Sequence, residues 1–244
     1  MRIIRHFEPS TIDPGTCSEW LLGTADDIGI HIRVRRGNSL PSAMGSADAE
    51  HYALILEGKA KLSATSAAEQ AASVGELIFV PIGKSASLLG DEHSVWAEII
   101  CPIKAEQASM EPKVVPVDPA KFEGGGFAYQ GLVDRATGAQ AMRMNVLQVA
   151  PGAGSPDFHI HAFAQIYLIQ EGELTLDVGC ARMVAHSNSL VVLPAGLVHR
   201  NFNASGSLER HVSFLVPEPA DGEIFDFAVT IHDREAEIMP TIPT

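Results

Sequence analysis

Two stretches of this chain repeat one another, and this duplication limits the folds that the chain can adopt. The run Leu54–Leu62, LILEGKAKL, aligns with Leu168–Leu176, LIQEGELTL, so that Gly58 matches Gly172 at an offset of 114 residues. A Pro-x-Gly turn follows each run at nearly the same offset. A repeat at a fixed offset indicates a modular architecture. The sequence therefore predicts two tandem domains of one kind.

The repeated units have the patterns of strands rather than helices. Short apolar runs, many of them alternating with polar residues, are bounded by Gly, Pro, Asn and Ser, and no segment has a strong helical period. Hydrophobic residues make up 46% of the chain and charged residues 19%, which suits a protein with a well-formed core. We therefore expect an all-β fold of two barrels, with short helical turns only.

Net charge, apolar run length and cysteine content limit the partners and the cellular compartment that we expect. The formal net charge is −13, which argues against nucleic acid or an anionic membrane as partner, because both need a basic surface. No apolar run approaches the roughly 18 residues of a membrane span, and the first residues lack the features of a signal peptide. The three cysteines are widely spaced, as in proteins of reducing compartments. We expect a cytoplasmic protein.

The second repeat carries residues with the spacing of metal ligands. The stretch Phe158–Glu173, FHIHAFAQIYLIQEGE, places His159, His161 and Gln165 at the spacing H-x-H-x3-Q. His199 follows the Pro-x-Gly turn in LPAGLVHRNFN. Side chains alternate along a strand, so both histidines of the first motif should point the same way, with the glutamine at the same parity. Three imidazoles and one amide oxygen from two paired strands would suit a divalent metal. Packing of the histidines inside a barrel is the alternative.

Both motifs resemble the signature motifs of the cupin superfamily. The pattern HxHx3(E/Q)x6G ends at Gly172, and the pattern PxGxxHx3N runs from Pro194 to Asn203. The resemblance implies two tandem cupin barrels of the double-stranded β-helix, or jelly-roll, type. It also implies one divalent transition metal per chain (Fe, Mn, Ni or Zn), with these ligands: His159, His161, Gln165 and His199.

Three positions depart from the cupin pattern. Ala153 and Asn188 stand where glycine is usual, and Gln165 stands where the ligand is usually Glu. Asn188 tolerates the left-handed backbone conformation that glycine adopts there. The neutral amide leaves a divalent centre one charge unit more positive than a carboxylate would. Such a centre should bind anions and polarise a carbonyl more strongly, and it should be harder to oxidise.

The first repeat lacks the ligand set. In the alignment, the four ligand positions are occupied by Gly45, Ala47, His51 and Ala86. A single imidazole does not hold a metal tightly, so His51 is expected to be a packed or surface residue. We therefore expect a degenerate N-terminal barrel without a metal site over residues 1–112, a linker over 113–126, and a metal-binding barrel with its tail over 127–244.

Two further side chains are candidates for catalysis or substrate binding. Tyr167 lies two residues beyond Gln165, and its phenol could donate to a bound substrate or accept a proton. Cupin-type dimethylsulfoniopropionate lyases are similar in this respect, whereas the alternative is that the ring fills the barrel. Arg143 could meet a substrate carboxylate or form a surface salt bridge. His186 and His211 lie outside the motifs and are not expected to bind the metal.

These features favour a metal-dependent enzyme that acts on a small organic acid or enol-type metabolite. By family resemblance, dioxygenase-like chemistry is the first expectation. A non-redox isomerase, lyase or decarboxylase that uses the metal as a Lewis acid is the alternative that Gln165 favours, and a non-catalytic small-molecule-binding cupin is the third. The resemblance also implies a homodimer, since exposed edge strands invite pairing. The fold does not identify the substrate.

Overall fold

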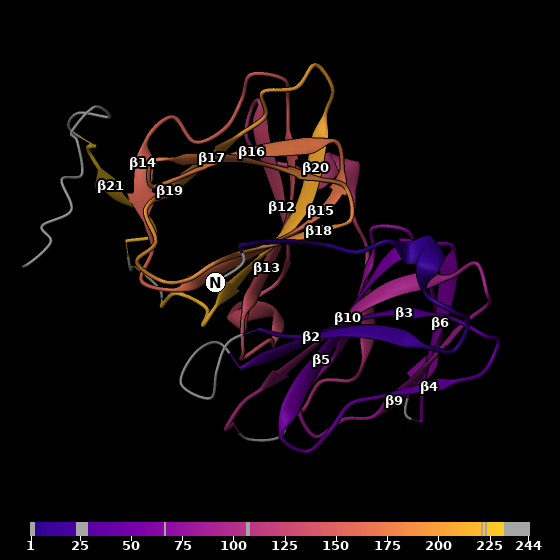
Figure 1. The fold of residues 1–244 in the computed structure, drawn as a ribbon. Helices are drawn as coiled ribbons and strands as arrows, with labels where there is room; N and C mark the ends of the chain where they lie inside the picture. The colour runs from indigo at the N-terminus through magenta and orange to yellow at the C-terminus, as the bar shows by residue number, and fades with distance from the viewer. Residues whose placement is uncertain are drawn as a thin grey trace, which may run out of the picture.

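The described residues form two barrels, and each barrel consists of one six-stranded sheet and one smaller sheet (Figure 1). The computed structural model describes residues 3–22, 29–65, 67–105, 108–220, 222 and 224–231. The C-terminal tail, 232–244, which the sequence assigns to the second barrel's domain, lies outside the described residues. The predicted all-β fold of two tandem barrels is confirmed.

The first barrel contains strands β2 (Cys17–Leu22), β3 (Ile30–Arg36), β4 (Ser42–Met44), β5 (Ala49–Glu57), β6 (Lys59–Ala64), β7 (Ala67–Ser73), β8 (Leu77–Val80), β9 (Ala86–Gly90), β10 (Val95–Pro102) and β11 (Lys113–Val115). Its six-stranded sheet has the order β11-β8-β5-β10-β3-β2, and its second sheet has the order β4-β9-β6-β7.

The second barrel contains strands β1 (Ile4–His6), β12 (Phe127–Val133), β13 (Arg143–Val149), β14 (Phe158–Ile160), β15 (Ala164–Glu171), β16 (Glu173–Val178), β17 (Ala181–His186), β18 (Ser189–Leu193), β19 (His199–Phe202), β20 (Glu209–Val216) and β21 (Phe227–Val229). Its sheets have the orders β1-β18-β15-β20-β13-β12 and β17-β16-β19-β14-β21. Three short 3-10 helices complete the described elements: η1 (Pro9–Thr11), η2 (Pro119–Lys121) and η3 (Arg135–Thr137). Within the described residues, no helix is long and apolar enough to cross a membrane.

The two large sheets have the same strand order. They differ in the part of the chain that supplies one of the two outermost strands. The place beside β8 is taken by β11, which lies in the segment predicted to be the linker and pairs Lys113 with Phe79. The equivalent place beside β18 is taken by β1, which pairs Ile4 with Val191. The strand that begins the chain therefore belongs to the sheet of the second barrel, and Figure 1 shows the N-terminus beside that barrel.

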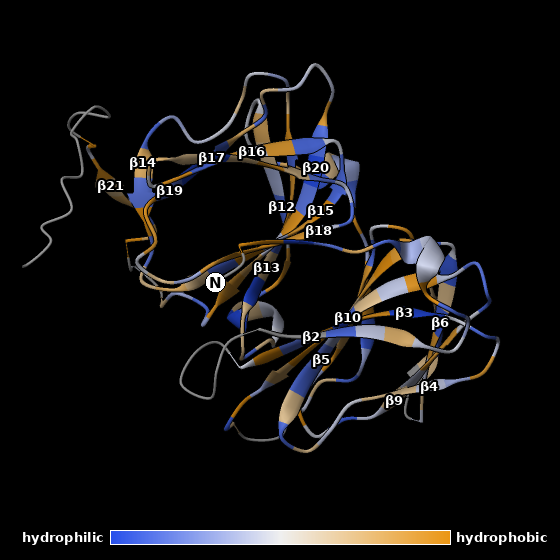
Figure 2. Ribbon diagram, viewed as in Figure 1, coloured by the Kyte–Doolittle hydropathy of each residue, from blue (hydrophilic) through white to orange (hydrophobic). Residues whose placement is uncertain are grey.

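The two barrels share one hydrophobic core between their large sheets. Alternation along β15 sends Ile166 and Leu168 into this shared core and turns Tyr167 and Ile169 into the barrel. The first barrel contributes Leu54 and its neighbours to the same core. Figure 2 shows hydrophobic residues along strands of both barrels, including β18 and β13, where the barrels meet. Because one face of each sheet is buried against the other barrel, the opposite face is left to line each barrel's interior.

A buried carboxylate joins the two barrels. Glu50 on β5 is fully buried and accepts hydrogen bonds from the backbone N–H groups of Gln140 at 3.0 Å and Ala141 at 2.9 Å. The phenol of Tyr52 donates to the same carboxylate at 2.5 Å. The N-terminal barrel thus fixes the loop that leads into β13, which is a wall of the second barrel.

Replacing Glu50 with alanine should lower the free energy of unfolding by roughly 3 kcal/mol, because buried donors left without an acceptor cost about 1–3 kcal/mol each. Urea unfolding followed by circular dichroism measures the loss. The control is Glu57→Ala, which removes an exposed carboxylate from the same strand and should change stability by less than about 0.5 kcal/mol. Equal losses in the two variants would show that Glu50 does not hold the barrels together.

Candidate metal site

The four predicted ligands come from both sheets of the second barrel. His159 lies on β14, directly across from His199 on β19, and Gln165 lies on β15 of the six-stranded sheet. His161 follows the end of β14, in the short segment that carries the chain from one sheet to the other. The chain turns here, so alternation along one strand does not reach from His161 to Gln165. The side chain of Gln165 reaches the histidines because the chain crosses from one sheet to the other, and not because it alternates along the same strand as His159.

The turn of the second motif supports the first motif directly. The backbone N–H of Gly196 donates to the carbonyl of His161 at 2.8 Å. Gly196 has φ +75°, a left-handed conformation that glycine adopts without strain. The N–H of Leu197 closes the turn on the carbonyl of Pro194 at 3.2 Å. The Pro-x-Gly sequence therefore holds the backbone at His161 as well as leading into the strand of His199.

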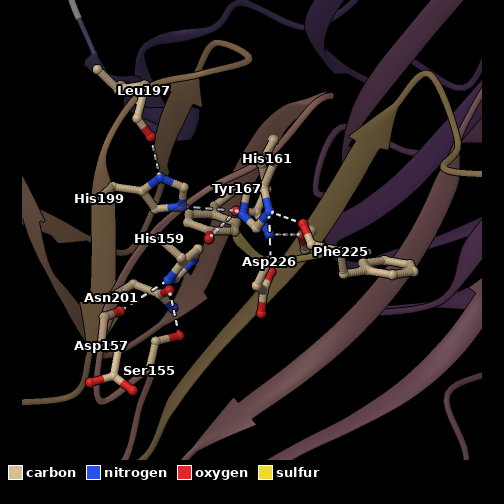
Figure 3. Close-up of polar contacts among 12 residues, drawn as sticks. Ser155, Asp157, His159, His161, Tyr167, Leu197, His199, Asn201, Phe225 and Asp226 are labelled. Atoms are coloured by element: carbon tan, nitrogen blue, oxygen red, sulfur yellow. Dashed lines mark hydrogen bonds and ion pairs between the residues drawn. The ribbon is translucent and has the colours of Figure 1, made fainter. Parts of the chain in front are cut away.

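Backbone carbonyls orient all three imidazoles (Figure 3). Each Nδ1 lies within hydrogen-bond distance of a carbonyl oxygen; the acceptors are Asp157 at 3.0 Å from His159, Phe225 at 2.8 Å from His161 and Leu197 at 2.8 Å from His199. A carbonyl only accepts, so the ring proton sits on Nδ1 and each Nε2 carries a free lone pair. Such bonds orient the histidine ligands of protein metal sites.

The free lone pairs converge on one point. One ligand atom from each of His159, His161 and His199 lies within 4.8 Å of those of the other two. Gln165 Oε1 lies 3.1 Å from His161 Nε2 and 3.3 Å from His199 Nε2. These facing atoms are all acceptors, and a cation between them would satisfy all of them at once. Imidazole nitrogen and amide oxygen suit Fe, Mn, Ni and Zn. The three-histidine group can thus hold a metal, and the chemistry of the donor set fits one.

Burial and neighbouring charges set the protonation of the histidines. Burial, together with nearby His159 and His161, lowers the pKa of His199 to about 4, which keeps the ring in the neutral form that binds metals. Burial also acts to lower the pKa of His161, but hydrogen bonds to Asp226 and Phe225 outweigh it and raise that pKa. The hydrogen bond to His161, with 3.2 Å between Nδ1 and Oδ1, lowers the pKa of Asp226.

A cavity of about 510 Å³ opens beside the histidines. Tyr167 lines it, is almost fully buried, and donates its phenol to Gln165 Oε1 at 2.7 Å. Burial raises the pKa of Tyr167 above its ordinary value, so the side chain is a phenol and a hydrogen-bond donor. Arg143 also lines the cavity, with Nη2 3.6 Å from Asp134 Oδ2. The wall therefore carries both a cation and a buried hydroxyl.

The comparisons agree with this geometry. A family model described as cupin domain matches residues 145–212, which include His159, His161, Gln165 and His199. This segment of the second barrel is therefore a cupin domain. No curated protein matched the sequence.

Solved structures with the same fold include known cupins. A cupin 2 conserved barrel domain protein from Leptotrichia buccalis superposes with a TM-score of 0.62 at 14% identity, covering 84% of this chain and 91% of that one. Oxalate decarboxylase of Bacillus subtilis, which has Mn(II) centres, gives 0.67 at 11% identity, with 93% and 79% covered. Oxalate decarboxylase of Lactobacillus farciminis, solved as a formate complex, gives 0.67 at 13%, with 94% and 89% covered. At these identities the match concerns the fold.

The first barrel has a different interior. His51, which aligns with Gln165, is buried with Nδ1 3.5 Å from Glu98 Oε1. Glu98 in turn accepts from Arg35 at 2.8 Å. Within the part of the chain that the structure describes, the three histidines of the second barrel form the one group of three or more potential ligands drawn from His, Cys, Asp and Glu.

Some residues of the site have no motif to mark them. Asp226, beside His161, lies in the segment before β21, where no sequence pattern indicates a site. His211 and Ser213 line the cavity from β20, and the alternation of this strand was the signal that could have placed them there. Asn203, by contrast, is fully buried and ties the loop after β19 by donating to the carbonyls of Val149 and Ser207. Its role is therefore structural.

Proposed function

We propose that this cupin is a metal-dependent enzyme that binds a small anionic carboxylate or enol and acts on it by acid–base chemistry. The observation that carries the proposal is the convergence of three Nε2 atoms and Gln165 Oε1 at the wall of the cavity. A divalent metal held by His159, His161, Gln165 and His199 would supply a Lewis acid that polarises an oxygen of the substrate. The neutral ligand set favours an anion over a neutral molecule.

Donors on the cavity wall support an anionic substrate. Arg143 lines the cavity from β13, and its guanidinium forms a long ion pair with Asp134, at 3.6 Å. Asn201 is buried, lines the cavity, and its Nδ2 has no hydrogen-bond partner among the described residues. Arginine and amide N–H groups both bind carboxylates. A cavity of about 510 Å³ suits a small metabolite.

Loading the protein separately with Fe(II), Mn(II), Ni(II) and Zn(II) tests the proposal. Each form is incubated with a panel of 2-hydroxy, 2-oxo and dicarboxylic acids while dissolved oxygen and products are followed. Turnover without oxygen consumption supports acid–base chemistry at a Lewis acid. Oxygen consumption that matches product formation would contradict the proposed acid–base chemistry. It would support the dioxygenase-like reaction that the family resemblance favours. Binding without turnover in all four forms would favour a binding protein.

Replacing Gln165 with glutamate should weaken the binding of oxalate to the Zn(II)-loaded protein by about tenfold or more, since it lowers the charge of the site by one unit. Titration calorimetry measures the affinity, after metal analysis has shown equal zinc content in parent and variant. Gln148→Glu on β13 makes the same chemical change away from the cavity lining and should leave oxalate affinity close to that of the parent. Equal affinities in all three proteins would contradict the electrostatic argument.

A further inference from the structure

A buried carboxylate and imidazole lie side by side on β20. Glu209 and His211 are two residues apart, so they share the inner face of the strand, and both are fully buried. His211 Nδ1 lies 2.9 Å from each oxygen of the Glu209 carboxylate. A carboxylate accepts, so this contact places the ring proton on Nδ1. Nε2 of His211 is then a hydrogen-bond acceptor.

The His211 side chain is part of the lining of the same cavity as His159, His161 and Gln165, and its Nε2 atom is buried there. This Nε2 has no hydrogen-bond partner within the described parts of the chain. Its ring packs against Tyr167 with 4.7 Å between centroids. It is not a member of the three-histidine cluster. A buried polar atom without a partner costs free energy, and a bound molecule that donates to Nε2 would remove that cost.

The first barrel shows that packing alone does not require this pair. His211 is paired with Ile169 across the sheet, and the matching residue of the first barrel, Ile55, is paired with Trp96. The inner position that holds His211 therefore holds an indole ring in the other copy, where it packs in the barrel core and its Nε1 has no hydrogen-bond partner among the described residues. A barrel of this topology folds without a carboxylate–imidazole pair at that position. The pair of Glu209 and His211 lies in the barrel that has the three-histidine group.

We infer that His211 accepts the proton of a substrate hydroxyl, so that the cavity selects a 2-hydroxy acid or an enol. This inference rests on the proposed function for the end of the substrate that reaches the metal ligands. When the substrate O–H bond breaks, its electron pair stays on the substrate oxygen and the proton forms a new bond to Nε2. The resulting imidazolium is paired with the Glu209 carboxylate, which holds the ring in place throughout.

Nitrogen NMR of the histidine rings tests whether the Nε2 atom of His211 is a hydrogen-bond acceptor. The measurement on the parent protein decides this question. In both the metal-free and the Zn(II)-loaded protein, His211 should show the proton on Nδ1. In Glu209→Gln, the amide N–H₂ can donate to Nδ1, and the proton should move to Nε2. A parent protein with the His211 proton on Nε2 would overturn the inference, because that atom could not accept.

Ligand binding tests whether the cavity prefers a substrate that carries a hydroxyl proton. Glycolate carries a hydroxyl proton, whereas methoxyacetate has the same carboxylate and an ether in its place. The parent should prefer glycolate by about tenfold, the value of one added hydrogen bond. The double variant Glu209→Leu with His211→Phe, which replaces both polar side chains with apolar ones, should lose the preference and keep its zinc. An unchanged preference, or loss of the zinc with the pair, would overturn the inference.

The two proposals fail in different ways. If the parent binds no metal, the proposed function fails, while the tautomer of His211 and the glycolate preference of the metal-free protein still decide the inference. If the parent binds metal and turns over an acid without a hydroxyl as well as its hydroxy analogue, the inference fails and the proposed function stands. Should the double variant not fold, the tautomer measured in the parent decides the inference by itself.

Discussion

The variant His161→Ala should lose its metal while its barrel stays folded. His161 belongs to the three-histidine group, and its Nε2 lies 3.1 Å from Gln165 Oε1, closer than the Nε2 of His199 at 3.3 Å. Changes to residues that only support metal ligands cost about 10–100-fold in affinity, so removal of a ligand should cost more than about 100-fold. The apolar interior around Leu174 and Leu176 is untouched, and folding rests chiefly on such strands.

Metal per chain by mass spectrometry, with competition against a chelator, measures this loss, and circular dichroism reports the fold. The matched control is His51→Ala, which removes the histidine at the position of Gln165 in the first barrel. The parent and the control should each hold one metal per chain. Two metals in the parent would contradict the expectation of a metal-free first barrel. Stoichiometric, tightly held metal in His161→Ala would show that His161 is not a ligand.

Much of the fold could be predicted because the sequence contains two copies of the same repeat. The repeat around Gly58 and Gly172 indicates the duplication, and the strand patterns on either side indicate barrels. The exchange of outer strands could not be predicted. β1 is only three residues long, and its partner β18 lies more than 180 residues further along the chain. Such pairing depends on which sheet edge lies within reach after both barrels have formed, and no local pattern carries that information.

The group of three histidines could be predicted from the sequence, but its geometry only in part. The spacing of His159, His161 and Gln165 indicates ligands, yet the structure joins them across two sheets rather than along one strand. Asp226 reaches His161 from a segment more than 60 residues later, and nothing in its neighbourhood marks it. His211 lies outside both motifs, so neither motif predicts a role for it at the site. Motifs report ligands whose spacing is local, whereas the remaining walls of a barrel cavity come from strands that meet only in the folded chain.

The variant Tyr167→Phe distinguishes two roles of this side chain. Either the ring only fills the barrel, or its hydroxyl takes part in the reaction. Phenylalanine keeps the ring against His211, at 4.7 Å between centroids in the parent, and removes only the hydroxyl that donates to Gln165 at 2.7 Å. The fold and the metal content should therefore be unchanged. Turnover of a substrate found in the panel should fall by about 100-fold, the scale of a lost proton donor.

The control for this variant is Tyr129→Phe, which removes a second phenol from the cavity lining. Tyr129 is 45% exposed on β12, so its hydroxyl is solvated and its loss should change turnover by less than about twofold. Measuring kcat and KM separately sharpens the comparison. A loss confined to kcat indicates an interaction made in the transition state, while a rise in KM alone indicates substrate binding. If Tyr167→Phe turns over at the parental rate with its metal in place, the hydroxyl has no part in the reaction and the ring serves the packing of the barrel.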